Sequence, residues 1–398
     1  MASRLKAARR PVILPGTGVR AAGAVDLFHR VVERLGVPVA TGFSAHDLMT
    51  DDHPLLAGQP GTIGTRAGNF AVQNADLVLV LGCRLNIRQI SYNWAAFARA
   101  ADVMMVDIDA GELAKPTLSV DLPVHADLRA FLEHLLAALD GWEGPPEHAG
   151  WRAWCRTRKD RYPANLAAYA ERKEPVNPYA FLGLLWEVLA EGDAVVAANA
   201  TACIVGFQTA RLKRGQRLFS NSGSASMGYD LPAAIGAHLA GEGGRTLCLA
   251  GDGSIMMNLQ ELQTIAGNAL PIKIFLLNNA GYASIRQSQQ AWFPDNLVGC
   301  EPGNGVSLPD FLRVAAAFGI PARRVSHLDD AAAAIAATLE SSGPQLCEVM
   351  LDPAQGFAPK LSSRRLEDGR MVSAALEDMA PFLSREELAE NMLIPPQE

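Results

Sequence analysis

The sequence predicts an α/β protein built from two doubly wound parallel sheets. Short apolar runs alternate with helical patterns through residues 1–140, which is typical of repeated strand–helix units. A second series of the same kind occupies residues 175–355, after a segment with the composition of a linker. With 398 residues, of which 49% are hydrophobic and 19% charged, the chain is long enough to bury two cores.

The first domain, residues 1–140, is predicted to be a sheet covered by helices. Its apolar runs have the length of strands, and each is followed by a turn or a helical pattern. The predicted elements, in chain order, are a strand at 11–14, a helix at 24–35, strands at 37–40, 77–81 and 103–108, and a helix at 128–139. Residues 141–174 are predicted to be a linker, marked by Pro145 and Pro146, and a polar helical segment.

The second domain, residues 175–355, repeats this alternation. Its predicted elements are strands at 194–198, 247–250, 272–277 and 346–351 and helices at 179–189, 259–266 and 309–318. The C-terminal tail, residues 356–398, is polar and contains helical pieces and turn signals. We expect this tail to wrap around a domain of its own chain or a partner.

Composition and charge exclude several classes of protein. A net charge of −7, without a basic patch interleaved with aromatic residues, gives no reason to expect nucleic-acid binding. The six cysteines are scattered without metal-ligand spacing, which indicates reduced thiols in a cytoplasmic protein. The basic residues 1–10 lack an apolar segment, and no apolar run reaches membrane-spanning length. We therefore expect a cytoplasmic protein that binds neither nucleic acid nor membrane.

Two oxygen-bearing side chains directly follow two predicted strands. Asp252 lies in Gly-Asp-Gly-Ser after the strand at 247–250, and Asn279 lies in Asn-Asn-Ala-Gly after the strand at 272–277. Because the carboxyl ends of parallel strands share one edge of a sheet, both are expected where α/β proteins bind ligands. Their oxygens suit Mg²⁺, and the glycines let the backbone approach a phosphate. Each motif alone could be an ordinary turn, since Gly, Asp and Asn are common turn residues.

In this order and at this separation, the motifs GDGS and NNAGY resemble the signature of thiamine diphosphate enzymes of the acetolactate synthase and pyruvate decarboxylase group. In that family the Asp, the second Asn and the main-chain oxygen two residues later hold Mg²⁺, which holds the diphosphate of the cofactor. The resemblance therefore implies that Asp252, Asn279 and Gly281 are the metal ligands, and that thiamine diphosphate and Mg²⁺ are the cofactors.

The segment 221–237 is similar to the same family in a second place. In the family, a bulky apolar residue before a glycine wedges between the two rings of the cofactor and bends it. Met227 has this position, and its backbone and the carbonyl of Ala225 would bond the pyrimidine; ordinary core packing is the alternative for Met227. Thr201 matches a phosphate-loop position loosely, and a local turn explains it as well. The candidate cofactor contacts are Thr201, Ala225, Met227, Gly251, Gly253, Ser254 and Ala283.

The resemblance covers two domains of such an enzyme, the central domain and the diphosphate-binding domain. The pyrimidine-binding domain, which supplies the glutamate that activates the cofactor, has no counterpart in this sequence. No catalytic residue of this chain is assigned by motif, and Glu261 is expected to serve its local helix. The resemblance therefore implies a separate subunit that carries the pyrimidine-binding domain, a heterotetramer with two copies of each chain, and a chain that is inactive alone.

The resemblance also implies the chemistry. The leading hypothesis is the large subunit of a split enzyme that decarboxylates a 2-oxo acid such as pyruvate and transfers the acyl unit to a second carbonyl, as acetolactate synthase does. One alternative is a split decarboxylase that releases an aldehyde, and another is a non-catalytic cofactor-binding subunit. A nicotinamide dehydrogenase has only the incomplete glycine motif at Gly16 and Gly18 in its favour.

Two further features leave alternatives open. The central domain of acetolactate synthases often binds FAD, for which Gly16, Gly18, Arg84 and Asp109 are candidate contacts; relatives also carry this domain with ADP or with no ligand, and an Asp can simply end a strand. After the Asn pair the stretch 284–290 is polar where acetolactate synthases have a Trp. Arg286 or the glutamines could therefore meet a hydroxylated or anionic acceptor, such as a ketosugar, or form a solvated helix face.

Overall fold

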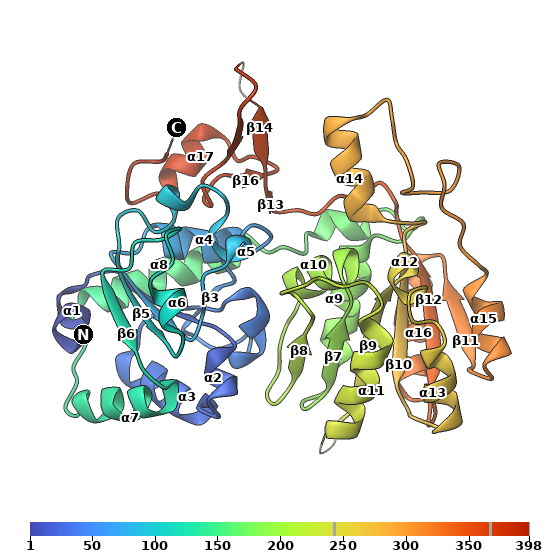
Figure 1. The fold of residues 1–398 in the computed structure, drawn as a ribbon, viewed down its shortest axis with the longest axis horizontal. Coiled ribbons are helices and arrows are strands. Elements are labelled where there is room, and N and C mark those ends of the chain that lie inside the picture. The colour runs from blue at the N-terminus through green and yellow to red at the C-terminus, as the bar shows by residue number, and fades with distance from the viewer. Residues whose placement is uncertain (242–243, 366–367, 398) are drawn as a thin grey trace. The chain divides into compact units, whose positions relative to one another are not determined.

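The computed structural model describes residues 1–241, 244–365 and 368–397, and its contacts divide the chain into two compact units (Figure 1). Unit 1 comprises Met1–Pro163 and Ala358–Glu398, and unit 2 comprises Ala164–Phe357. Most of the segment 141–174, expected to be a linker and a helical segment, therefore folds with unit 1, and so does the tail. Each unit is a doubly wound α/β fold, which confirms the predicted fold class.

Unit 1 contains a six-stranded parallel sheet in the order β3-β2-β1-β4-β5-β6. The strands are β1 (Pro11–Pro15), β2 (Val39–Ala40), β3 (Leu56–Gly58), β4 (Leu77–Leu81), β5 (Asp102–Asp107) and β6 (Leu122–His125). The direction of winding reverses between β1 and β4, where ligands bind in folds of this type. The sequence did not predict β3 or β6, because β3 has only three residues and β6 is a half-exposed edge strand that contains Pro123.

Apolar side chains pack on both faces of this sheet. Successive residues of a strand point to opposite faces, so Val12 and Leu14 belong to one buried cluster and Ile13 to the other. Asp127 begins the helix at 128–138 by accepting a hydrogen bond from the N–H of Ala130. The helices are α1 (Ala2–Ala7), α2 (Gly18–Ala21), α3 (Val25–Leu35), α4 (Arg66–Gln73), α5 (Ile87–Ile90), α6 (Ala110–Leu113), α7 (Leu128–Ala138) and α8 (Glu147–Arg161).

The C-terminal tail completes unit 1. It forms two short antiparallel pairs and a final helix. These elements are β13 (Lys360–Leu361) with β16 (Met379–Ala380), β14 (Ser363–Arg365) with β15 (Met371–Ser373), and α17 (Arg385–Glu390). The buried Glu377 forms an ion pair with Arg99 at 2.8 Å, and it accepts a hydrogen bond from the Gln73 amide at 2.7 Å. The tail thus folds as part of unit 1.

Unit 2 contains a second six-stranded parallel sheet, in the order β11-β12-β10-β9-β7-β8. Its strands are β7 (Ala194–Ala197), β8 (Arg217–Phe219), β9 (Thr246–Gly251), β10 (Lys273–Asn278), β11 (Ala322–Val325) and β12 (Gln345–Met350). Its helices are α9 (Pro178–Val188), α10 (Ala200–Gln208), α11 (Asp230–Ala240), α12 (Asp252–Ile255), α13 (Glu261–Gly267), α14 (Ala283–Trp292), α15 (Phe311–Ala317) and α16 (Ala331–Leu339). Strands β8 and β11, both at the edges, were not predicted.

The topology of unit 2 fixes where a ligand can bind. The chain passes from β7 to β8 on one side and then continues with β9 and β10 on the other, so the winding direction reverses beside β7. Helices α12 and α14 stand at the end of the sheet where β9 and β10 finish (Figure 1). No helix in the described part of the chain combines the length and apolar content that crossing a membrane requires.

Candidate functional site

Asp252 is a buried carboxylate at the carboxyl end of β9. Only 1% of the residue is exposed. Its Oδ1 accepts a hydrogen bond from the N–H of Gly253 and its Oδ2 accepts one from the N–H of Gly281, both at 2.8 Å. Burial raises the pKa of Asp252 to about 6, while the two N–H donors and the positive charge of Arg286 act in the opposite direction. Because burial outweighs these groups, a bound cation would stabilise the charged form of Asp252.

Asn279 follows the neighbouring strand β10 and lies at the same edge of the sheet. Its Nδ2 donates to the Thr201 hydroxyl at 3.0 Å, and Thr201 belongs to α10, which follows β7. The Oδ1 of Asn279 is buried, and none of the described residues donates a hydrogen bond to it. A buried amide oxygen without a donor is costly unless a ligand reaches it. The structure thus brings Asp252, Asn279, Gly281 and Thr201 together at the ends of three strands.

Gly281 turns the chain between Asn279 and α14. Its φ of +123° is disfavoured for residues with a side chain, and a Cβ at this position would overlap the carbonyl oxygen of Cys300. The N–H of the next residue, Tyr282, donates to that carbonyl at 2.8 Å. Only glycine therefore fits between the Asp252 carboxylate and the Cys300 backbone.

We expect Gly281→Ala to lower metal-dependent cofactor affinity at least about 10-fold and to cost about 2 kcal/mol of unfolding free energy, because the turn must move away from Asp252. Isothermal titration and urea unfolding measure the two effects. Gly236→Ala in α11 is the matched control, since a Cβ there meets nothing within 4 Å. Equal behaviour of the two variants would contradict the role of the turn.

The segment that precedes α11 approaches the Asp252 turn from the other side. The N–H of Gly228 donates to the Ser254 hydroxyl at 3.0 Å, and its carbonyl accepts from the Asn258 amide at 2.7 Å. Met227 is 37% exposed, so it is not an ordinary core residue. The carbonyl of Ala225 accepts a hydrogen bond from the Asn199 amide at 3.2 Å, which occupies one of its two acceptor positions.

The remaining candidate cofactor contacts differ in what they can offer. Ser254 is buried and its hydroxyl lies near Asp230 as well as Gly228. The N–H of Gly253 already donates to Asp252, and the Cα of Gly253 lies against the ring of Tyr282. Gly251 is the last residue of β9, and Ala283 is the first residue of α14. The latter's N–H belongs to the first turn of a helix, where N–H groups lack partners within the helix.

Three alanines around the site adopt a left-handed backbone conformation that the sequence did not indicate. They are Ala200 (φ 49°) at the first position of α10, Ala225 (φ 52°) before α11 and Ala280 (φ 59°) after β10. Residues with a Cβ pay roughly 1–2 kcal/mol for this conformation, which concentrates at functional sites. An alanine carries no sequence signal for positive φ, although Asn199 and Asn279 precede two of the three.

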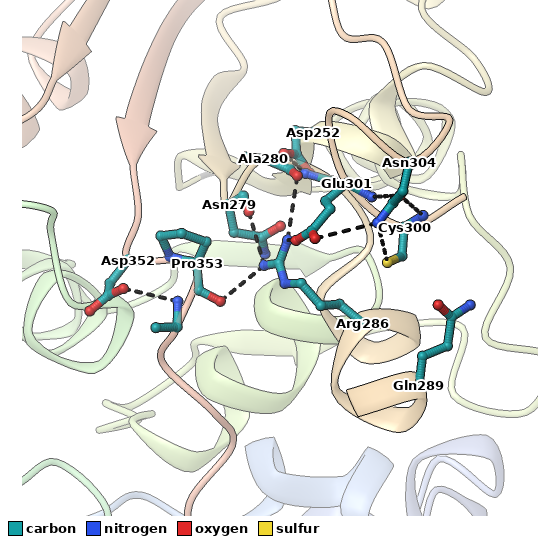
Figure 2. A network of polar contacts seen from close by, with 12 residues as sticks. Asp252, Asn279, Ala280, Arg286, Gln289, Cys300, Glu301, Asn304, Asp352 and Pro353 are labelled. Carbon is teal, nitrogen blue, oxygen red and sulfur yellow. Dashed lines mark hydrogen bonds and ion pairs between the residues drawn. The ribbon is translucent and has the colours of Figure 1, made fainter. Parts of the chain in front are cut away.

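Arg286 does not fit either interpretation of the polar stretch 284–290. It is only 3% exposed, so it is not part of a solvated face, and its guanidinium is occupied by backbone carbonyls of the Asn279 turn (Figure 2). It is therefore not available to an acceptor substrate. Gln289 bonds both backbone groups of Val298 at 2.9 Å and is likewise structural. The polar stretch gave no sign of a buried arginine, because the carbonyls that accept from it are brought together only by the fold of the turn and by Pro353, 67 residues away.

The candidate FAD or ADP contacts lie at the carboxyl edge of the sheet in unit 1. The N–H groups of Gly16 and Gly18 donate to the carbonyls of Leu81 and Gly82, at 2.9 and 3.0 Å. A Cβ on either glycine would overlap the Gly82 backbone, so these glycines serve the close approach of two loops.

The two charged candidates in unit 1 also have local partners. Arg84 pairs with Glu112 at 3.8 Å, and Asp109 begins α6 by accepting from the N–H of Gly111 at 2.7 Å. All four residues thus have structural roles within this edge. Among the described residues of both units, no cluster of three or more His, Cys, Asp or Glu side chains could hold a metal, so the set of Asp252, Asn279 and Gly281 would rely on a single carboxylate.

Two family models match the chain. The model of the thiamine pyrophosphate (thiamine diphosphate) enzyme central domain matches residues 1–135, and the model of the C-terminal thiamine pyrophosphate-binding domain matches residues 200–349. These matches together cover well over half of the chain, and each falls on one of the two sheets.

Curated relatives agree with the models. A probable chloroplastic acetolactate synthase 2 of Oryza sativa subsp. japonica is 31% identical over 368 residues, or 89% of this chain and 54% of that protein. The acetolactate synthase isozyme 2 large subunit of Escherichia coli (strain K12) is 31% identical over 359 residues, which are 89% of this chain and 62% of that protein. A probable acetolactate synthase large subunit of Methanocaldococcus jannaschii is 29% identical over 357 residues, which are 87% of this chain and 58% of that protein.

The chain spans a little over half the length of the curated relatives it matches. The aligned part includes both units, with the Asp252 and Asn279 motifs inside the C-terminal match. The chain therefore belongs to the thiamine pyrophosphate enzymes and is acetolactate synthase-like, and it carries the central domain and the C-terminal cofactor-binding domain of that family.

Proposed function

We propose that this chain holds thiamine diphosphate through Mg²⁺ at the carboxyl edge of the sheet in unit 2, as the large subunit of a split, acetolactate synthase-like enzyme. The observation that carries the proposal is the buried Oδ1 of Asn279, without a donor among the described residues, beside the buried Asp252 carboxylate. One carboxylate, one amide oxygen and one backbone carbonyl suit Mg²⁺, which completes its shell with phosphate and water.

Asp252, Asn279 and the carbonyl of Gly281 would hold the metal, and Thr201 orients the Asn279 amide through its 3.0 Å hydrogen bond. Ser254 and the first turn of α14 at Ala283 lie at the same edge and would bond the diphosphate. The half-exposed Met227, tied to the Asp252 turn through Gly228 and Ser254, would support the bent shape of the cofactor. When bound, the cofactor supplies a nucleophilic carbon and an electron sink for decarboxylation of a 2-oxo acid.

A second polypeptide that carries the pyrimidine-binding domain is part of this proposal, in a heterotetramer with two copies of each chain. The share of the relatives' length that this chain spans supports it. A second support is a group of exposed large apolar side chains on the segments around the site, because a cluster of such side chains is typical of an interface. They are Met227, Met256, Met257, Ile285, Trp292, Phe293 and Val298.

The proposal is tested in two steps. Calorimetric titration of the chain with thiamine diphosphate, with Mg²⁺ and with a chelator, tests the cofactor site; binding that ignores the metal would contradict it. Coexpression with a pyrimidine-binding domain encoded by a neighbouring reading frame, once a search of the surrounding genes has found one, tests the split enzyme through native mass spectrometry and release of CO₂ from pyruvate. An acyloin product supports carboligation, an aldehyde supports the alternative of a split decarboxylase, and a complex without turnover supports a non-catalytic subunit.

FAD in unit 1 is a separate part of the proposal. Because the N–H groups of Gly16 and Gly18 are engaged by backbone carbonyls, a flavin diphosphate would have to find other donors at this edge. Flavin absorbance of the protein after incubation with FAD and gel filtration decides whether this edge retains it.

A further inference from the structure

Arg286 lies on α14, one helical turn after the Asn279 turn, and it is one of the few buried charged residues of unit 2. Its Nη2 donates to the carbonyls of Asn279 at 3.1 Å and Pro353 at 3.0 Å, and its Nη1 reaches the carbonyl of Ala280 at 3.4 Å. Figure 2 shows the guanidinium between these three backbone oxygens. A single side chain thus gathers carbonyls from two segments of the chain.

The turn that Arg286 holds is the one that bears two of the proposed metal ligands. Ala280 and Gly281 both have positive φ, 59° and 123°, so the turn is costly by itself. On one side the N–H of Gly281 is fixed by Asp252, and on the other side the carbonyls of Asn279 and Ala280 are fixed by Arg286. The backbone between these two anchors has little freedom to move.

The charge of Arg286 is balanced by a loop that packs on the same turn. Its Nη1 lies 3.5 Å from the carboxylate of Glu301, and the N–H groups of Cys300 and Glu301 donate to the Asn304 side chain at 3.0 and 2.9 Å. The carbonyl of Cys300 in turn accepts from Tyr282. This loop, residues 299–304, is therefore tied to the turn both directly and through Arg286.

We propose that Arg286 is a positioning residue that sets the geometry of the metal ligands Asn279 and Gly281, and with it the preference of the site for Mg²⁺ over larger cations. The proposal rests on the proposed metal site. Mg²⁺ demands near-ideal octahedral geometry with short bonds, whereas Ca²⁺ tolerates irregular and longer ones. A turn that the guanidinium holds rigidly therefore favours Mg²⁺ over Ca²⁺.

A lysine cannot replace this arrangement. The guanidinium presents five N–H groups in a planar fork, which matches three carbonyls spread around it, whereas an ammonium is a single point charge on a flexible stem. Arg286→Lys keeps the charge that balances Glu301 but loses the simultaneous contacts. Arg286→Met keeps most of the volume and loses both.

The experiment titrates Mg²⁺ and, separately, Ca²⁺ into the chain at a fixed saturating concentration of thiamine diphosphate, with binding followed by intrinsic tryptophan fluorescence. For Arg286→Lys and Arg286→Met we expect the Mg²⁺ concentration at half-saturation to rise about 10- to 100-fold, as for other partners of metal ligands. The Ca²⁺ concentration at half-saturation should rise less, so that the ratio of the Mg²⁺ value to the Ca²⁺ value increases about 10-fold.

Arg245→Met is the matched control. Arg245 forms a paired interaction with the buried Asp193, at 3.1 and 2.6 Å, and lies at the amino end of β9, the opposite edge of the same sheet. This variant should lose stability in thermal unfolding but keep the wild-type ratio of Mg²⁺ to Ca²⁺ half-saturation. A merely structural role of Arg286 would make its variants behave in the same way.

The outcomes separate the two proposals. If the wild-type chain responds to Mg²⁺ and the Arg286 variants keep its Mg²⁺ to Ca²⁺ ratio, the positioning role is overturned and the metal site stands. If the wild-type chain binds the cofactor without any response to Mg²⁺, or not at all, the proposed metal site fails and the positioning role fails with it. A shifted ratio in both Arg286 variants, with the Arg245 variant unchanged, supports the proposal.

Discussion

Replacing Asp252 with asparagine is expected to weaken Mg²⁺-dependent binding of thiamine diphosphate by about 100-fold or more. The loss of a direct charged ligand should exceed the roughly 10- to 100-fold effect of removing a partner of a ligand. Calorimetric titration with and without Mg²⁺ measures the change. Asp193→Asn is the matched control, because Asp193 is also a buried carboxyl of unit 2 but directly precedes β7, at the opposite edge of the sheet. This control should bind the cofactor like the wild type. If Asp252→Asn also binds like the wild type, Asp252 does not hold the metal.

The raised pKa of Asp252 also predicts how pH acts on the protein without metal. An ordinary Asp has a pKa of 3.8, and that of Asp252 in the folded chain is about 6. As pH rises between these values the unfolded chain releases this proton and the folded chain keeps it, so stability falls, by about 3 kcal/mol at pH 7. Well below pH 3.8 this carboxyl is protonated in both states, and the penalty is absent.

Thermal unfolding of the wild type and of Asp252→Asn across pH 4 to 7 isolates this effect. We expect the difference in Tm to move in favour of the variant as pH rises, because only the wild type has the buried acid. The slope of this Tm difference against pH is the test. The NH₂ group of the new Asn would face the N–H of Gly253 or Gly281, which shifts the Tm of the variant by the same amount at every pH. Mg²⁺ affinity of the wild type should also fall below about pH 6, where the proton competes. Parallel Tm curves would contradict the burial argument.

The sequence could predict the sheet positions of the site because each of its motifs follows a strong strand pattern. Residues 77–81 were predicted to be a strand and are β4, and the predicted strands at 247–250 and 272–277 are β9 and β10 within two residues at each end. Once these two are parallel neighbours, Asp252 and Asn279 must lie at one edge. The local sequence pattern was therefore enough to predict where these two side chains lie.

The sequence could not predict the groups that hold these motifs in place. The positive φ of Ala280 follows from contacts on both sides of the turn, and alanine has no preference that reveals it. Arg286 has the appearance of a surface residue in the polar stretch 284–290. The carbonyls of Asn279, Ala280 and Pro353 and the carboxylate of Glu301 make its burial favourable. Tertiary contacts determine the conformation of Ala280 and the burial of Arg286, and no local propensity encodes such contacts.

The same limit applied to the tail, where the buried acid Glu377 contacts residues that lie far away in the sequence. Arg99→Met is expected to lower the unfolding free energy of unit 1 by about 3 kcal/mol, because Glu377 would remain buried with only the amide of Gln73 as a partner. Urea unfolding, followed by the tryptophan fluorescence of Trp151 and its neighbours in unit 1, measures the loss.

Two further variants decide whether the buried charge causes this loss. Arg385→Met removes another arginine–carboxylate pair of the tail, with Asp378 at 2.9 Å, but one whose arginine is largely exposed, and should cost less than about 1 kcal/mol. Adding Glu377→Gln to Arg99→Met should restore part of the stability, because no unpaired charge is then left in the interior. If Arg99→Met costs no more than Arg385→Met, the tail is held by its apolar contacts, such as the buried Leu376 and Met379, and not by this ion pair.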